Sequence, residues 1–223
     1  MYEASLTLKS KITIIKEIKK KLNAARQRIF NTTCFGPWLD LTDISTDPAL
    51  VHTFLQLDAF PENPESETLY FQLDNLPAFR YGPEEFCLIT RLRFGEYPTL
   101  RNVVGRESVI TRIFGNQRLE IKEVVRVFKT LGTPQVDLDD EDAIRVSLLV
   151  MMDRFFLGRD RPLLVANTLL RAVEDFESWN QYPWGSYVWT TTYNQMHHAI
   201  TKRAGDLRSK MTMTGFLFVF KVS

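Results

Sequence analysis

The chain has 223 residues, of which 44% are hydrophobic and 12% aromatic, so it can bury a sizeable core and is not an intrinsically disordered chain. Its 28 basic and 27 acidic residues leave a net charge of +1, which argues against a protein whose whole surface coats nucleic acid. Two cysteines make no disulfide framework, and no apolar run approaches the roughly 20 residues of a membrane-spanning helix.

The first 28 residues are basic. Eight Lys and Arg against two Glu give this segment +6, which leaves −5 for the remainder because the whole chain carries +1. The spacing of Ile12, Ile15 and Leu22 predicts an amphipathic helix, with lysines around its other faces. These cations could neutralise nucleic-acid phosphates, or they could be only the solvated side of a packed helix. The residues that would contact nucleic acid are Lys16, Lys19, Lys20, Lys21, Arg26 and Arg28.

The next segments combine an aromatic loop, a helix and a surface loop. The loop Asn31–Leu41 is rich in aromatic residues, and we expect it to fold onto the core. Asp47 and Pro48 are an N-capping acid and a first-turn proline, so they predict a helix over 49–57. Two prolines and three glutamates make Phe60–Thr68 a surface loop.

A strand–strand–helix unit follows. Leu69–Leu73 alternates at strand spacing, and Ala78–Tyr81 can return as a second strand after a turn. Pro83 and the two glutamates after it predict the start of a helix that ends near Gly95. The pattern therefore predicts a small antiparallel β element near residues 69–81.

The second half of the chain is predicted to be helical. Helical periodicity and terminal signals predict helices at Leu119–Leu131, Ala143–Leu157, Leu163–Trp179 and Ser186–Arg203. The second of these has few polar faces, so we expect it to be central. The acidic run Asp137–Asp142 lacks the glycine and glutamate of a calcium loop and is better explained as a helix N-cap. The predicted fold class is mainly α (α+β), a single helical domain with the small antiparallel β element near residues 69–81.

Catalytic and cofactor motifs are weak in this sequence. Cys34, in the aromatic loop, is a better thiol candidate than Cys87, which falls on a helix among apolar residues. His197 and His198 are adjacent, so on a helix they point about 100° apart and do not readily share a metal ion. The glycines stand in no phosphate-binding motif. We therefore expect no catalytic, cofactor-binding or metal site.

The segment YPWGSYVW (Tyr182–Trp189) concentrates large aromatic residues. It could be a stacking platform for bases or a groove for a peptide. The interpretation we favour is a packed turn between helices, with Trp184 and Trp189 filling gaps in the core.

Three stretches carry a family resemblance: TCFGPWLDL at 33–41, LYFQLDNLPAFRYGPEEFCLITRLRFG at 69–95 and VEDFESWNQYPWGSYVW at 173–189. With residues 213–216 they resemble, in the same order, the plant domain of unknown function number nineteen eighty-five. Two positions depart from the family pattern. Arg91 stands where the family usually has glycine, and the chain ends at Ser223, where members usually continue with a tryptophan-containing segment.

The resemblance implies a domain of plant proteins derived from Mutator-like transposable elements. There the domain often precedes a SUMO-protease-like cysteine peptidase of the ubiquitin-like protease family, and that peptidase module is absent from this chain. The family has no established catalytic residues within the domain, so none is carried over. We expect a basic amphipathic helix or arm at 1–28 and a single domain at 29–223, truncated at its C-terminus.

The expected function is a non-catalytic interaction module of a transposon-derived plant protein. We expect it to be intracellular and nuclear, with the cytoplasm as the alternative. Its partner would be protein or DNA, with no membrane, no cofactor and no small-molecule ligand indicated. Two alternatives stay open, namely a nucleic-acid-binding module acting through the basic N-terminal helix and a thiol enzyme using Cys34.

Overall fold

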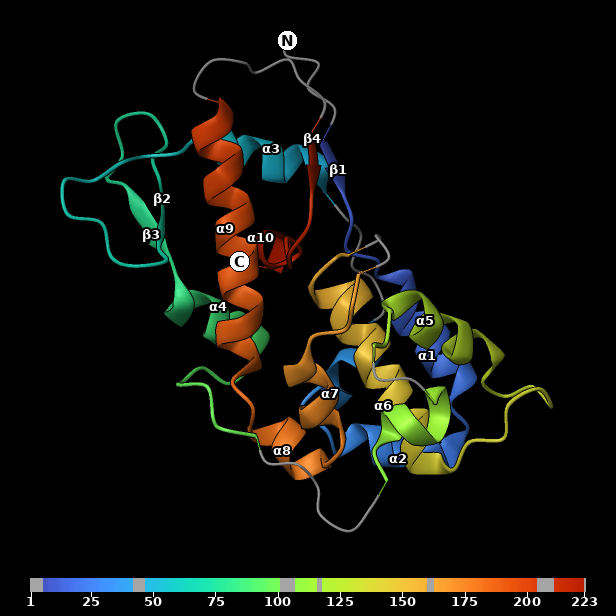
Figure 1. Ribbon diagram of the computed structural model, residues 1–223. Coiled ribbons are helices and arrows are strands. Elements are labelled where there is room, and N and C mark those ends of the chain that lie inside the picture. Colours follow the sequence, from blue (N-terminus) through green and yellow to red (C-terminus); the bar gives the residue numbers. More distant parts are fainter. Residues whose placement is uncertain are drawn as a thin grey trace.

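The computed structural model describes residues 6–41, 47–100, 107–115, 118–159, 163–203 and 211–222. Helices dominate these ranges, which confirms the mainly α (α+β) fold class (Figure 1). The α-helices are α1 (Thr13–Lys21), α2 (Ala24–Asn31), α3 (Pro48–Gln56), α4 (Pro83–Thr90), α5 (Ile121–Thr130), α6 (Asp140–Met151), α7 (Asn167–Val173), α8 (Phe176–Gln181), α9 (Trp184–Arg203) and α10 (Val219–Val222). Shorter helical elements are η1 (Gly36–Asp40), η2 (Ile110–Phe114) and η3 (Met152–Phe156), and the strands are β1 (Leu6–Leu8), β2 (Leu69–Phe71), β3 (Phe79–Tyr81) and β4 (Met211–Met213).

Helix α6 is the central helix that the sequence predicted. All of its residues from Asp142 to Met151 are buried, because α1, α2, α5 and α7 pack around it. The Asp139 carboxylate caps the helix by accepting a hydrogen bond of 2.7 Å from the Asp142 backbone N–H. The helix continues as the π-helical element η3, and Gly158 follows with a φ of 59°. The predicted N-cap role of the acidic run is therefore confirmed at Asp139.

The predicted antiparallel hairpin is confirmed. Strands β2 and β3 pair with Leu69 opposite Tyr81 and Phe71 opposite Phe79. A second pairing, which was not predicted, joins β1 in parallel to β4 and so ties the two ends of the described chain together (Figure 1). Each of these strands has only three residues, which is too short to leave a clear alternating pattern.

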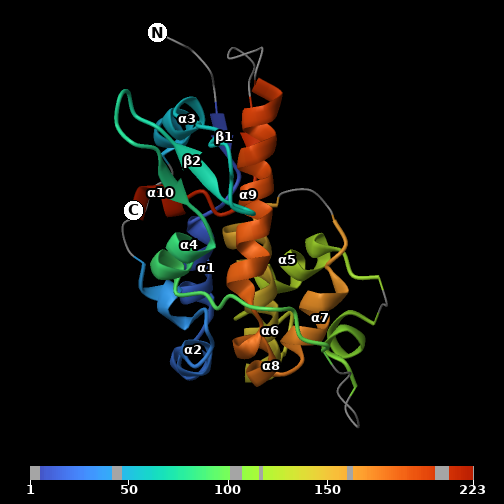
Figure 2. The same cartoon turned by 90° about the vertical axis from the view of Figure 1, so that its left-hand side faces the viewer.

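Helix α9 spans the molecule from the end that holds α3, β1 and β4 to the end that holds α8 (Figures 1 and 2). Helix α9 begins at Trp184, so most of the segment expected as an interhelix turn is the first part of this helix, but Trp184 and Trp189 are fully buried and fill the core as predicted. The apolar residues 216–220 near the C-terminus are also buried, with α10 packing against α3 and α4. No helix within the described ranges is long and apolar enough to span a membrane.

Two helices end well before the residue that the sequence predicted. The helix expected at Leu163–Trp179 is divided into α7 and α8, because the Asp175 carboxylate accepts from the Ser178 backbone N–H at 2.8 Å and starts a new helix. Helix α4 ends at Thr90 rather than near Gly95. The next residue, Arg91, adopts the left-handed conformation with a φ of 57°, which stops the helix.

Helices α1 and α2 lie on the main body of the protein. Ile14, Ile18, Leu22 and Phe30 are buried in the same hydrophobic cluster as the residues of α6. The amphipathic helix predicted at 12–22 is confirmed, with its lysines on the faces away from the core. The division of the chain into 1–28 and 29–223 stays a prediction.

Candidate functional site

The six cations predicted to contact nucleic acid fall into two groups. Lys16, Lys20 and Arg28 are exposed, and their side chains make no hydrogen bond or ion pair with any residue in the described ranges. Lys16 and Lys20 are one helical turn apart on α1, so they share a face. These three side chains are available to an external anion.

The other three cations hold the structure together. The Lys19 ammonium lies 3.6 Å from the Asp40 carboxylate, and Lys21 Nζ donates to the Lys129 carbonyl at 2.6 Å. The Arg26 guanidinium pairs with Asp140 at 2.8 Å and donates to the Leu138 carbonyl at 2.7 Å. They connect α1 and α2 to η1, to the end of α5 and to the start of α6, so a ligand would have to compete with these interactions.

The candidate thiol of Cys34 is not activated. Burial raises the pKa of this thiol to about 12, more than a backbone hydrogen bond lowers it. The Cys34 backbone N–H donates to Asn180 Oδ1 at 2.7 Å, so the loop is held against α8. A thiol with this pKa is protonated at neutral pH, whereas a nucleophilic cysteine needs a lowered pKa. His197 and His198 are exposed on α9, and no group of His, Cys, Asp and Glu in the described ranges could hold a metal ion.

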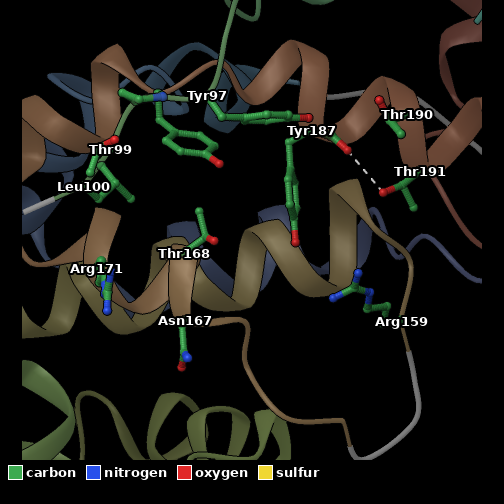
Figure 3. Close-up of a pocket in the computed structure, with 12 residues that line it drawn as sticks. Tyr97, Thr99, Leu100, Arg159, Asn167, Thr168, Arg171, Tyr187, Thr190 and Thr191 are labelled. Atoms are coloured by element: carbon green, nitrogen blue, oxygen red, sulfur yellow. Dashed lines mark hydrogen bonds between the residues drawn. The ribbon is translucent and has the colours of Figure 1, made fainter.

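A pocket of about 710 Å³ opens between the segment 97–100, helix α7 and the first half of α9 (Figure 3). We call it the Tyr97 pocket. Its apolar and aromatic lining residues are Tyr97, Pro98, Leu100, Tyr182 and Tyr187. Its polar lining residues are Thr99, Arg159, Asn167, Thr168, Arg171, Thr190 and Thr191. This volume is in the range of about 300–1,000 Å³ that is usual for ligand sites.

The tyrosines form the walls of the Tyr97 pocket. The rings of Tyr97 and Tyr182 are 5.9 Å apart at their centroids, and Tyr182 packs on buried Trp184 at 4.3 Å. Burial raises the pKa of Tyr182 to about 12. It also raises the pKa of Tyr97, by more than a hydrogen bond with Thr190 lowers it. Both phenols are therefore neutral at pH 7 and can donate hydrogen bonds.

Two guanidinium groups set the charge of the pocket. Arg159 and Arg171 lie at opposite sides of it, with Tyr187 and Thr168 between them (Figure 3). Neither guanidinium makes a hydrogen bond or an ion pair with the residues that the structure describes. Two carboxylates lie near the lining: Glu67 accepts from Thr190 Oγ1 at 3.1 Å, and Asp153 attracts Arg159 electrostatically. Among the described lining residues there is no carboxylate, imidazole or thiol, and the two guanidinium groups favour the binding of an anion.

Sequence reasoning missed this pocket. Tyr97, Arg159 and Arg171 come from three separate segments, and none stands in a recognisable motif. The one available signal was YPWGSYVW. Its tryptophans pack as expected, while Tyr182 and Tyr187 of the same segment line the pocket.

A model of a protein family described as a domain of unknown function (DUF1985) matches residues 62–195. The match spans every residue that lines the Tyr97 pocket and excludes α1 and α2. No curated protein and no solved structure matches the chain.

Proposed function

The chain belongs to the DUF1985 family, and on that premise we propose that it is a non-catalytic interaction module. The observation that carries the proposal is the lining of the Tyr97 pocket, whose described residues offer guanidinium groups, hydroxyls and aromatic ring faces but no carboxylate, imidazole or thiol that would activate a hydroxyl as a nucleophile. The raised pKa of the Cys34 thiol supports the same conclusion, because it argues against the thiol-enzyme alternative.

As part of this proposal, we place the module in plant proteins derived from Mutator-like transposable elements, and in the nucleus. This context is supported by the amino-acid sequence of residues 33–41, 69–95 and 173–189, which resembles that of the family. In such proteins the module would bind a partner, while a SUMO-protease-like domain elsewhere in the same protein would carry out the catalysis.

The test is to block the pocket. The intact chain is used as bait in a plant nuclear extract, and captured proteins and nucleic acids are quantified. Thr191→Trp places a large ring in the Tyr97 pocket. Thr201→Trp is the matched control, because Thr201 lies on the same helix, makes the same type of hydrogen bond to a carbonyl one turn back, and does not line the pocket.

We expect partners that the wild type and Thr201→Trp both capture and Thr191→Trp loses. Equal capture by all three proteins would contradict the proposal, provided that thermal unfolding shows Thr191→Trp to be folded.

A second candidate function is nucleic-acid binding by the exposed cations of α1 and α2. The observation that favours it is that Lys16, Lys20 and Arg28 have no intramolecular partner among the described residues. The double substitution of Lys16 and Lys20 by Ala should lower the salt slope of duplex DNA binding by about 0.9 for each phosphate that the protein no longer neutralises. The same double substitution at Lys19 and Lys21 should change the slope less, because these lysines already bind groups of the protein. Undetectable or salt-insensitive binding would exclude this function.

A further inference from the structure

We propose that the Tyr97 pocket binds nucleotide units of single-stranded nucleic acid, with bases stacked on Tyr97 and Tyr187 and phosphates bound by Arg159 and Arg171. This proposal rests on the proposed interaction function and names the ligand of the same site. It places nucleic acid in this pocket and not on α1 and α2, whose cations the sequence predicted as the contact residues.

The aromatic walls carry the first part of the argument. Tyr97 is 54% exposed although its ring faces a concave surface, and Tyr187 projects into the space between the two arginines (Figure 3). An accessible ring face in a pocket is a platform on which a base can stack, and such stacking tolerates any base. Tyr182 and Trp184 support Tyr97 from behind, so the platform is held by ring-to-ring packing.

The two guanidinium groups of the pocket indicate a ligand with more than one negative charge. Arg159 and Arg171 lie at opposite sides of the pocket, and neither guanidinium makes a hydrogen bond or an ion pair with the described residues (Figure 3). A guanidinium binds phosphate through two parallel hydrogen bonds. A ligand that satisfies two separated guanidinium groups must carry anions at two places, which a phosphodiester strand does and a single carboxylate does not.

The remaining lining supports a polar and planar ligand over an apolar peptide anchor. Of the described lining residues only Pro98 and Leu100 are aliphatic, whereas Thr168 and Asn167 offer a hydroxyl and an amide group. These groups both donate and accept, so they can meet the edges of different bases. An apolar anchor side chain would leave them without partners, at a cost in affinity.

The experiment measures fluorescence anisotropy of a labelled oligothymidylate about ten nucleotides long, titrated with the intact chain at several salt concentrations. The variants are Tyr97→Ala, Tyr97→Phe and Arg171→Ala. Arg126→Ala is the charge-matched control, because Arg126 is exposed on α5 and does not line the pocket. Thymidine monophosphate is the competitor that distinguishes a free nucleotide from a strand.

We expect the wild type to bind, and Tyr97→Ala to weaken binding at least fivefold, while Tyr97→Phe keeps the ring face and binds like the wild type. Arg171→Ala should weaken binding and reduce the salt slope by about 0.7, the value for one neutralised phosphate in a single strand. Arg126→Ala should leave affinity unchanged. Efficient competition by thymidine monophosphate would identify a free nucleotide as sufficient, and weak competition would identify a continuous strand. Both results support nucleotide recognition.

Absence of binding, or binding that Tyr97→Ala and Arg171→Ala leave unchanged, would overturn the inference. Binding that disappears only when Lys16 and Lys20 are replaced would overturn it as well, and would place nucleic acid on α1. If Thr191→Trp loses captured partners while the oligonucleotide does not bind, the interaction function stands and only the ligand assignment fails.

Discussion

Each end of the central helix holds a buried carboxylate, Asp142 in α6 and Asp153 in η3, and the two differ in their hydrogen-bond partners. At the start of α6, Asp142 accepts hydrogen bonds from Arg112 at 3.0 Å and from Arg145 at 2.9 Å. In η3, at the other end, Asp153 is equally buried, with Arg154 Nε 3.4 Å away, and its Oδ2 atom has no hydrogen-bond partner among the described residues. The charge of Asp142 is therefore compensated by hydrogen-bonded guanidinium groups, whereas that of Asp153 is compensated only in part.

The contrast is visible in the direction of the two pKa shifts. Burial alone would raise the pKa of Asp142, but hydrogen bonds from Arg112 and Arg145 outweigh it and lower that pKa. Burial raises the pKa of Asp153 to about 6, against weaker attraction from Arg154 and Arg159. Asp142 thus stabilises the folded state when ionised, whereas the ionised form of Asp153 destabilises it.

The largest expected change in the free energy of unfolding comes from removing the charge of Asp142. Asp142→Asn leaves Arg112 and the buried Arg145 with less compensation, so the free energy of unfolding should fall by about 3 kcal/mol. Urea denaturation measures it. Asp140→Asn is the control, because Asp140 is half exposed and, among the described residues, pairs with Arg26 alone, and it should cost about 1 kcal/mol or less. Equal costs for the two variants would show that burial at Asp142 does not decide the outcome.

Removing the charge of Asp153 should change the free energy of unfolding in the opposite direction. Asp153→Asn keeps the shape of the side chain and removes the buried charge, so the free energy of unfolding at neutral pH should rise by about 2 kcal/mol. The same urea titrations measure it. A loss of stability would mean that the attraction of Arg154 and Arg159 outweighs the cost of burying the charge.

The pH dependence separates the two ends within the wild-type protein. Because the pKa of Asp142 is lowered on folding, its stabilising contribution is present above the unfolded-state pKa of about 3.9 and is lost as pH falls below it. Because the pKa of Asp153 is raised to about 6, the folded chain binds the extra proton between about pH 4 and 6. Stability from this group therefore decreases as pH rises through that window.

Unfolding free energies of the wild type and Asp153→Asn should accordingly be closest near pH 4, diverge up to about pH 6 and then run parallel. A constant difference from pH 4 to 8 would contradict the assignment of this titration to Asp153.

Local sequence patterns predicted the parts of this fold that local physics decides. The apolar run and capping acids of α6, the alternation in β2 and the proline at the start of α4 all act within a few residues. The β1–β4 pairing and the Arg112–Asp142 ion pair join distant segments, so no local pattern reports them. The division between α7 and α8 had a local signal in Asp175, which the continuing apolar periodicity concealed.

The candidate site was less predictable than the fold. A count of lysines predicts a basic surface, but it does not distinguish Lys20, which has no partner within the described ranges, from Lys21, which donates to two carbonyls. The Tyr97 pocket depends on the approach of Arg159 and Arg171 around Tyr187, and that approach is decided by helix packing.

The smallest predicted effect concerns the backbone conformation of the residues at which two helices end. Gly158 after η3 and Arg91 after α4 have nearly the same left-handed φ, 59° and 57°. A Cβ at residue 158 would lie 2.8 Å from the Ser10 backbone nitrogen, so glycine is required there. Arg91 is exposed and bears the steric cost of this conformation, which a glycine at the same position would not bear.

Arg91→Gly should therefore raise the free energy of unfolding by about 1 kcal/mol, since it removes the strain of the left-handed conformation and keeps the backbone hydrogen bond to the Cys87 carbonyl. Thermal unfolding measures it. Arg91→Ala is the control, because it removes the guanidinium but keeps a Cβ in the strained conformation, and it should give no gain. If both variants gain equally, the side chain rather than the backbone accounts for the cost at the end of α4.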